Sequence, residues 1–186
     1  MREYGDSSDF FKFLLEHDYS VHYETNEENR LIFLAYCSKF QKELAGHFGS
    51  VMFFYTIVQT NKYNMVRGTL SIQLNNGRIS PIVHCLLANQ EKQTFIKFFE
   101  ITFFNWIKPP GCILTDQDKA IIGAIRYCLK DLSHHVYCNR HAIENAQKNI
   151  SSLLSVDSFK DIGAEKKFRS IQKLWGYLIL FQRKKH

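Results

Sequence analysis

A candidate ligand for a divalent metal ion is Asp116, in the stretch Leu114-Thr-Asp-Gln-Asp-Lys119. It directly follows a short apolar run and opens an expected helix. Carboxylates are the ligands that Mg²⁺ and Mn²⁺ prefer, and two-ion sites that cut phosphodiester bonds need several of them. Asp is also a favoured helix N-cap, and Thr115-x-x-Asp118 resembles a capping box. The local sequence therefore leaves two roles open for Asp116, metal ligand and cap.

A second candidate site is Cys138-x-x-His141, with His134 and His135 nearby in the sequence. A thiolate and an imidazole at this spacing would supply half of a zinc site. A second ligand pair is missing, so zinc is not expected and a buried Cys beside a hydrogen-bonded His is the simpler interpretation. The 5 cysteines are dispersed and include no Cys-x-x-Cys pair. This pattern predicts reduced thiols in a cytosolic or nuclear compartment.

Basic side chains form a third set of candidates, because the 186-residue chain has a formal net charge of +6. Such a charge favours an anionic partner such as DNA. The residues selected as candidate DNA contacts are Lys62, Arg67, Arg78 and Arg140. Contacts to phosphates would be non-specific and sensitive to salt. Each of these cations could equally belong to an ordinary solvated surface.

The elements that must position these residues follow from hydrophobic periodicity and turn signals. Strands are expected over 19–23, 31–36, 51–58, 68–74, 79–87, 112–114 and 135–138, and helices over 7–17, 38–47, 93–107, 117–130 and 140–150. The first two strands form a hairpin, and Asn75-Asn-Gly-Arg78 is a turn. From residue 51 onward, the order of strands and helices is typical of an RNase H-like α/β (α+β) fold, a mixed sheet flanked by helices.

Two of these segments carry further predictions. Strand 51–58 is apolar on both faces, which predicts that neither face meets water. Helix 93–107 is apolar around its circumference, so it should pack on two sides. We expect three regions: an N-terminal helix, hairpin and linker (1–48), the core (49–150) and a C-terminal helical segment (151–186).

Four pieces of the chain, in order, resemble motifs of one family. They are Thr60-Asn-Lys-Tyr-Asn-Met65, Leu86-Leu-Ala-Asn-Gln-Glu-Lys-Gln-Thr-Phe95, Leu114-Thr-Asp-Gln-Asp-Lys-Ala120 and His135-x-x-Cys-x-x-His-x-x-x-Asn145. The family is the MULE (mutator-like element) transposase domain, which also occurs in plant far-red-impaired-response proteins. The resemblance implies an RNase H-like fold, metal-dependent DNA cleavage and a nuclear location. It also implies that Asp116 is the second catalytic carboxylate and that Cys138 and His141 belong to a family motif.

The first catalytic position departs from that family pattern. Counting back from Thr60, the family's first catalytic Asp falls on Tyr55, and no Asp or Glu lies between Glu43 and Glu91. A neutral phenol, with a pKa near 10, is a poor ligand for Mg²⁺. We therefore expect a site that cannot hold two catalytic ions.

Other departures point in the same direction. The family's Asp-Glu pair before the long helix is Asn89-Gln90 here, and the Trp before the motif histidine is Arg140. The third acid of such transposases lies beyond a helical insertion, and residue 186 is expected to fall within that insertion. Glu144 or Glu165 could substitute for it, although no spacing argument supports either.

Three functional hypotheses remain. The leading one is a degenerate, inactive MULE transposase domain that at most binds DNA or protein, with no cofactor. The second is an active enzyme that uses Asp116, a substitute acid, and Mg²⁺ or Mn²⁺. The third is an interaction domain of a transcriptional regulator resembling far-red-impaired-response proteins. No apolar stretch reaches the roughly 18 residues of a membrane span, so no membrane partner is expected, and the oligomeric state is not predicted.

Overall fold

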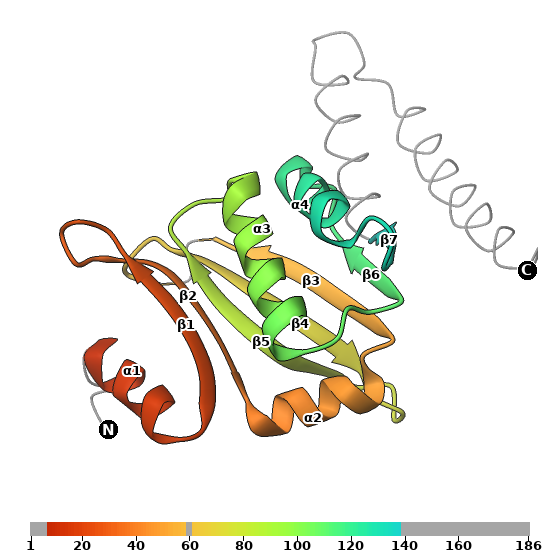
Figure 1. Ribbon diagram of the computed structural model, residues 1–186, viewed down its shortest axis with the longest axis horizontal. Coiled ribbons are helices and arrows are strands. Elements are labelled where there is room, and N and C mark those ends of the chain that lie inside the picture. Colours follow the sequence, from red (N-terminus) through yellow and green to blue (C-terminus); the bar gives the residue numbers. More distant parts are fainter. Residues whose placement is uncertain (1–6, 59–60, 139–186) are drawn as a thin grey trace, which may run out of the picture. The chain divides into compact units, whose positions relative to one another are not determined.

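The computed structural model describes residues 7–58 and 61–138, and Figure 1 shows their arrangement. The strands are β1 (Tyr19–Thr25), β2 (Leu31–Ser38), β3 (Val51–Ile57), β4 (Val66–Gln73), β5 (Ile79–Leu87), β6 (Cys112–Thr115) and β7 (His134–Tyr137). The helices are α1 (Ser7–Glu16), α2 (Lys39–Phe48), α3 (Lys92–Glu100), the π-helix η1 (Ile101–Trp106) and α4 (Lys119–Leu129). No helix among the described residues is long and apolar enough to cross a membrane.

All the described strands join one seven-stranded sheet in the order β1-β2-β5-β4-β3-β6-β7. The strands from β1 to β5 pair antiparallel, whereas β6 pairs parallel with both β3 and β7. The two parallel connections run through α3 and α4, as parallel pairing requires a long crossover. This arrangement confirms the predicted mixed α/β fold and is compatible with an RNase H-like topology. The predicted hairpin 19–36 is also confirmed, and it extends the sheet because β2 pairs with β5.

An aromatic core lies between the sheet and α3. The ring centroid of Phe54 lies 5.1 Å from that of Phe98, 5.1 Å from that of Phe99 and 6.0 Å from that of Phe95. Gly68 lies beside these rings, and a Cβ at this position would come within 2.5 Å of the Cys85 sulfur. The ring of Phe54 can occupy this space because residue 68 has no side chain.

The segment 93–107 packs on two sides as predicted, since α3 contacts Phe54 of the sheet and also α4. Its geometry differs from the prediction of one regular helix, because residues 101–106 form a π-helix. The consecutive residues Ile101, Thr102 and Phe103 are all buried there. Hydrophobic periodicity does not reveal a π-helical turn when the surrounding residues are apolar on all faces.

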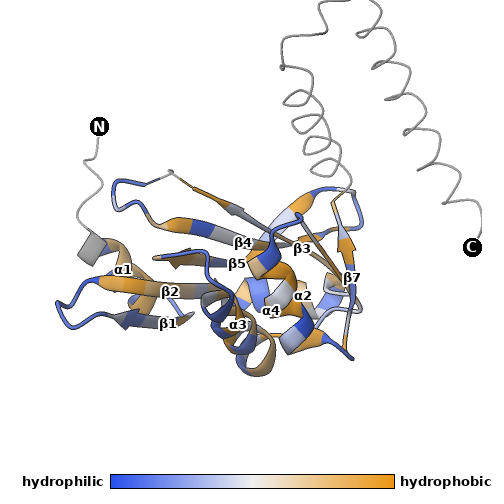
Figure 2. Ribbon diagram, turned by 90° about the horizontal axis from the view of Figure 1, so that it is seen from above, coloured by the Kyte–Doolittle hydropathy of each residue, from blue (hydrophilic) through white to orange (hydrophobic). Residues whose placement is uncertain are grey.

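The prediction that β3 is buried on both faces is wrong. Met52 and Phe54 are 1% exposed, but Val51, Tyr55 and Ile57 on the other face are 39%, 37% and 37% exposed. Figure 2 shows α3 and α4 on the same side of β3, β4 and β5. Among the described residues, these helices bury only one face of β3. The apolar composition of the strand was therefore a misleading indication that both faces are covered.

Candidate functional site

The two family positions, Tyr55 and Asp116, lie on neighbouring strands. β3 and β6 are parallel, with Val51 opposite Cys112, Met52 opposite Ile113 and Phe53 opposite Leu114. Continuing this register by two residues brings Tyr55 level with Asp116, the first residue after β6. The alignment of the sequence motifs thus corresponds to a spatial pairing at the carboxyl ends of two adjacent strands.

Asp116 is half-buried and is held by local hydrogen bonds. Its Oδ1 accepts from the backbone N–H of Asp118 at 3.2 Å, and its carbonyl oxygen accepts from the Thr115 hydroxyl at 2.7 Å. These contacts fix the turn between β6 and α4. The carboxylate therefore lies beside the end of β6.

The cap of α4 is Asp118, so the alternatives of an Asp116 cap or a capping box starting at Thr115 are wrong. Oδ1 of Asp118 accepts from the N–H groups of Ala120 at 2.8 Å and Ile121 at 2.9 Å. The backbone of Asp118 is extended (φ −66°, ψ 127°), which delays the helix by one half-turn relative to the prediction. The capping function is thus separate from Asp116.

His135 makes a contact that the sequence motif did not reveal. Its Nε2 lies 2.8 Å from the hydroxyl oxygen of Thr115, and Cys138 donates its N–H to the carbonyl of Thr115 at 2.7 Å. Burial, followed by the nearby Arg126, lowers the pKa of His135. Because β6 and β7 are paired in parallel, both contacts hold β7 against the strand that carries Asp116. The spacing His135-x-x-Cys138 is the only sequence signal for this arrangement.

The described residues do not fit a two-ion metal site. Over residues 7–58 and 61–138, no group of three or more His, Cys, Asp or Glu side chains is arranged to hold a metal ion. Tyr55 supplies a phenol where a second carboxylate would be needed. Arg140, His141, Glu144 and Glu165 lie outside the described residues, so their predicted roles stay predictions.

The candidate DNA contacts separate into two groups. Lys62 and Arg67 lie in the β3–β4 connection and at the start of β4, which is the same end of the sheet as Tyr55 and Asp116. Arg78 lies in the turn before β5, at the opposite end of the β4–β5 hairpin. Only the first pair is placed to act together with the site.

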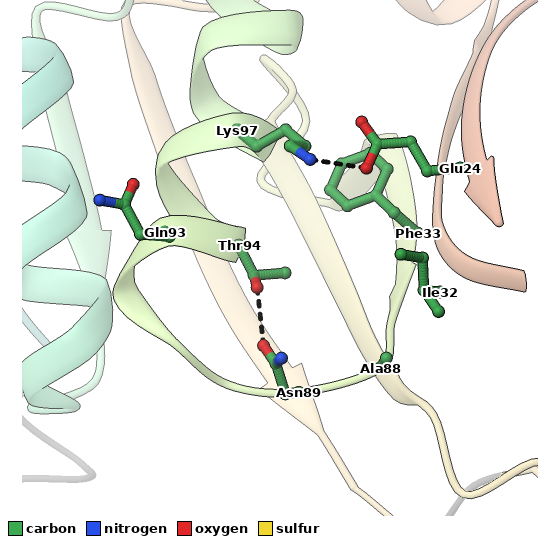
Figure 3. Close-up of a pocket in the computed structure, with 8 residues that line it drawn as sticks. All are labelled: Glu24, Ile32, Phe33, Ala88, Asn89, Gln93, Thr94 and Lys97. Carbon is green, nitrogen blue, oxygen red and sulfur yellow. Dashed lines mark hydrogen bonds and ion pairs between the residues drawn. The ribbon is translucent and has the colours of Figure 1, made fainter. Parts of the chain in front are cut away.

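Asn89, at the first position of the acidic pair expected from the family resemblance, makes hydrogen bonds that stabilise the start of α3. Oδ1 of Asn89 accepts from the Thr94 hydroxyl at 2.6 Å and from the Glu91 N–H at 3.2 Å. Figure 3 shows Asn89 in a pocket beside the ion pair between Glu24 and Lys97, whose O–N distance is 2.6 Å. The hydrogen bond from Lys97 holds the pKa of Glu24 below its usual value. This charged pair links the N-terminal hairpin to α3.

The model of one protein family matches the chain. It is the MULE transposase domain, and it matches residues 51–145, which are just over half of the sequence. The match begins with β3 and includes Tyr55, Asp116 and Cys138. A search of curated proteins found no match. The chain belongs to the MULE transposase domain family.

Proposed function

We propose that this chain is a degenerate MULE-type transposase domain that does not cut DNA and retains at most the binding of DNA or of a protein. The observation that carries this proposal is the parallel register of β3 and β6, which brings Tyr55 level with Asp116 when it is continued two residues beyond Phe53 and Leu114. The position level with the remaining carboxylate is occupied by a bulky, neutral side chain. A pair of divalent ions needs several anionic oxygens as ligands, and the positive charge of the ions offsets the repulsion between those oxygens.

The nearby carboxylates are poorly suited to replace the metal ligand that Tyr55 does not supply. Asp118 directs Oδ1 at two backbone N–H groups of α4, so metal binding through this oxygen would compete with the helix cap. Asp116 alone, with water completing the coordination, would bind Mg²⁺ weakly. An active enzyme would need acids such as Glu144 or Glu165 at this site.

The exposed cations of this region support DNA binding. Lys62 and Arg67 are exposed at the same end of the sheet as Asp116, so phosphates could approach without any metal ion. Such contacts would be independent of DNA sequence and would weaken as salt is added. We expect the protein to act in the nucleus, as its family suggests.

A cleavage assay on the full chain tests the loss of chemistry. Labelled duplex and single-stranded DNA would be incubated with Mg²⁺ or Mn²⁺, in parallel with the Asp116→Ala variant. We expect no divalent-dependent cleavage by either protein. Cleavage by the wild-type chain that Asp116→Ala abolishes would show that a working acidic site exists and would overturn the proposal.

A further inference from the structure

We propose that β1 pairs antiparallel with β1 of a second copy of this chain, with Tyr23 at the two-fold axis. The seven-stranded sheets of the two copies would then form one continuous sheet. We call this surface the β1 edge and define it by Tyr19–Thr25 together with Phe11 of α1. The inference goes beyond the proposed function and does not depend on it, because β1 lies outside residues 51–145 that match the family model.

The β1 edge is one of the two ends of the described sheet (Figure 1). An edge strand presents backbone N–H and C=O groups that can pair with another chain, and proteins usually block it with a short strand, proline, lysine or a bulge. β1 has seven residues, Tyr-Ser-Val-His-Tyr-Glu-Thr, and includes neither proline nor lysine. The irregularity in its pairing with β2 comes from Ile32, an extra residue in β2, so β1 itself stays continuous.

The strand at the other end of the sheet, β7, is less suited to such pairing. It has only four residues. A short edge strand offers few backbone groups to a partner and is itself a protective device. The pairing is therefore assigned to β1.

Helix α1 packs on one face of β1 and does not pair with its backbone. The ring centroid of Phe11 lies 4.6 Å from that of Tyr23, and the ring centroid of Phe13 lies 6.1 Å from that of Tyr19. Tyr19 and Tyr23 project to the same face of the strand, because side chains alternate between faces. Among the described residues, no backbone hydrogen bond joins α1 to β1. The helix thus leaves the backbone groups of the β1 edge to a partner strand.

The charges of β1 select one register for two copies. When the antiparallel pair is centred on Tyr23, Glu24 lies opposite His22 of the second copy, and the two-fold axis forms this pair twice. Centred on His22, the two imidazoles would face each other. Centred on Val21, Glu24 would face Asp18, a like charge that destabilises the pairing. Of these three registers, the Tyr23 register is the one that places an acid opposite a histidine.

Glu24 is already oriented for this contact. Its Oε2 accepts from Nζ of Lys97 at 2.6 Å, whereas its Oε1 has a longer contact of 3.5 Å with Nε2 of His22 in the same strand. The side chains of His22 and Glu24 are 43% and 33% exposed. Because Lys97 holds the carboxylate in place, little side-chain entropy is lost when the imidazole of the second copy approaches Oε1.

On the opposite face of β1, the two Tyr23 rings would meet at the two-fold axis. Directly opposite residues of antiparallel strands have Cα atoms about 4.5–5.5 Å apart, so their side chains are neighbours. The Tyr23 ring is 51% exposed, and Phe11 packs edge-on against it at an interplanar angle of 78°. The axis would therefore gather four aromatic rings, and aromatic pairs on one face stabilise strand pairing.

The interface is small, so the association should be weak. β1 and α1 contain 7 and 10 residues, which together are fewer than the roughly 20–30 residues on each side of a standard interface. We therefore expect a dissociation constant in the micromolar range.

Sedimentation velocity of the full chain, without DNA, tests the inference at concentrations of about 2 to 200 µM, which bracket a micromolar dissociation constant. Salt of about 0.15 M screens the repulsion between two chains of charge +6. We expect a concentration-dependent equilibrium of monomer and dimer. Tyr23→Lys should weaken it by about 10-fold or more, because it removes the central rings and brings two ammonium groups together. The matched control Tyr127→Lys, at a 66% exposed position on α4, should dimerise like wild type.

Two substitutions of His22 test the register. His22→Glu should weaken the dimer by about 2- to 30-fold, because each new acid would lie opposite Glu24 of the second copy. His22→Lys should dimerise at least as tightly as wild type, because the pair of opposite charges is kept. Equal weakening by both substitutions would contradict the Tyr23 register.

A cross-link tests the position of the axis. Opposite Cα atoms in an antiparallel pair lie within the distance range of a disulfide, so Tyr23→Cys should form a covalent dimer with oxidised glutathione. Tyr19→Cys is the matched control in the same strand. In the Tyr23 register the two copies of residue 19 are eight positions apart, about 27 Å, so this variant should not cross-link.

A chain that stays monomeric at the highest concentration would overturn the inference. So would a dimer that Tyr23→Lys leaves intact, because it would form through another surface. Thermal melts of all variants would confirm that they fold. The cleavage assay with Asp116→Ala tests the proposed function separately, since Asp116 is not part of the β1 edge.

Discussion

Adjacent residues of β3 have opposite environments. Phe54 is 1% exposed and packs among the rings of α3, whereas Tyr55 is 37% exposed on a face that the described helices leave uncovered. For β3, the packing against α3 is thus on one face, and the position that the sequence resemblance assigns to the first acid is on the other. A change at position 55 would therefore leave the core undisturbed, so the loss of chemistry that we propose is compatible with an intact fold.

The largest expected difference is between alanine substitutions at these two neighbours. Phe54→Ala should lower the free energy of unfolding by about 3–5 kcal/mol, because it leaves a cavity among packed rings. Tyr55→Ala should cost about 1 kcal/mol or less, as is usual at exposed positions. Urea denaturation of both variants measures the difference. Similar losses in the free energy of unfolding would mean that both faces of β3 are packed.

Gly68→Ala tests how closely the packed face is filled. Its added Cβ would meet the Cys85 sulfur at 2.5 Å and the Phe54 ring at 3.2 Å, so we expect a loss of about 1–3 kcal/mol from overpacking. Gly46→Ala is the matched control, since nothing lies within 4 Å of its new methyl group in α2. That control should gain about 0.5–1 kcal/mol from better helix propensity. An unchanged melting temperature in Gly68→Ala would argue against this packing.

The two aspartates after β6 should differ in the same way. Asp118→Ala removes two hydrogen bonds to the start of α4 and should cost about 1 kcal/mol. Asp116→Ala removes a single longer bond and should cost less. Thermal unfolding of the two variants compares them directly. If Asp116→Ala lowers the stability more than Asp118→Ala, then Asp116, and not Asp118, stabilises the start of α4.

The smallest expected effect is a pH dependence from His84, which is paired with Thr69 of β4. Burial first, and Arg67 second, lowers its pKa below the ordinary value of 6.5, so the unfolded chain binds the proton more tightly. Stability is therefore fully present above about pH 6.5 and falls as the pH drops toward the lowered pKa of the folded state. Denaturation at pH 7.5, 6.5 and 5.5 should show a smaller decrease in His84→Gln than in wild type. An equal loss of stability in both proteins at low pH would exclude His84 as the source of the pH dependence.

Sequence periodicity and turn residues were enough to predict the described strands, of which β2 and β3 are the most apolar. Gly77, at φ 78°, is one such residue, in the predicted turn 75–78. The sequence could not choose between Asp116 and Asp118 as the cap, since both precede the helix and only the extended backbone of residue 118 selects one. It also could not show that β3 has an open face, because composition does not reveal where the covering helices lie.

The pairing of Tyr55 with Asp116 was only partly accessible from sequence. Motif spacing identified the two positions, but their proximity depends on the parallel register of β3 and β6, which joins residues about 60 apart in the chain. The contact between His135 and Thr115 depends on the register of β6 and β7 in the same way. Long-range strand pairing therefore accounts for most of the site that sequence reasoning missed.

The most direct test of the proposed loss of the metal site is a calorimetric titration of the full chain with Mn²⁺, repeated for Asp116→Ala, Tyr55→Asp and the double variant. We expect wild type and Asp116→Ala to give the same weak signal. Tyr55→Asp should gain binding that the added Asp116→Ala removes, because the register brings the two carboxylates level. Tight Mn²⁺ binding by the wild-type chain that disappears in Asp116→Ala would contradict the central claim that Tyr55 has eliminated the metal site.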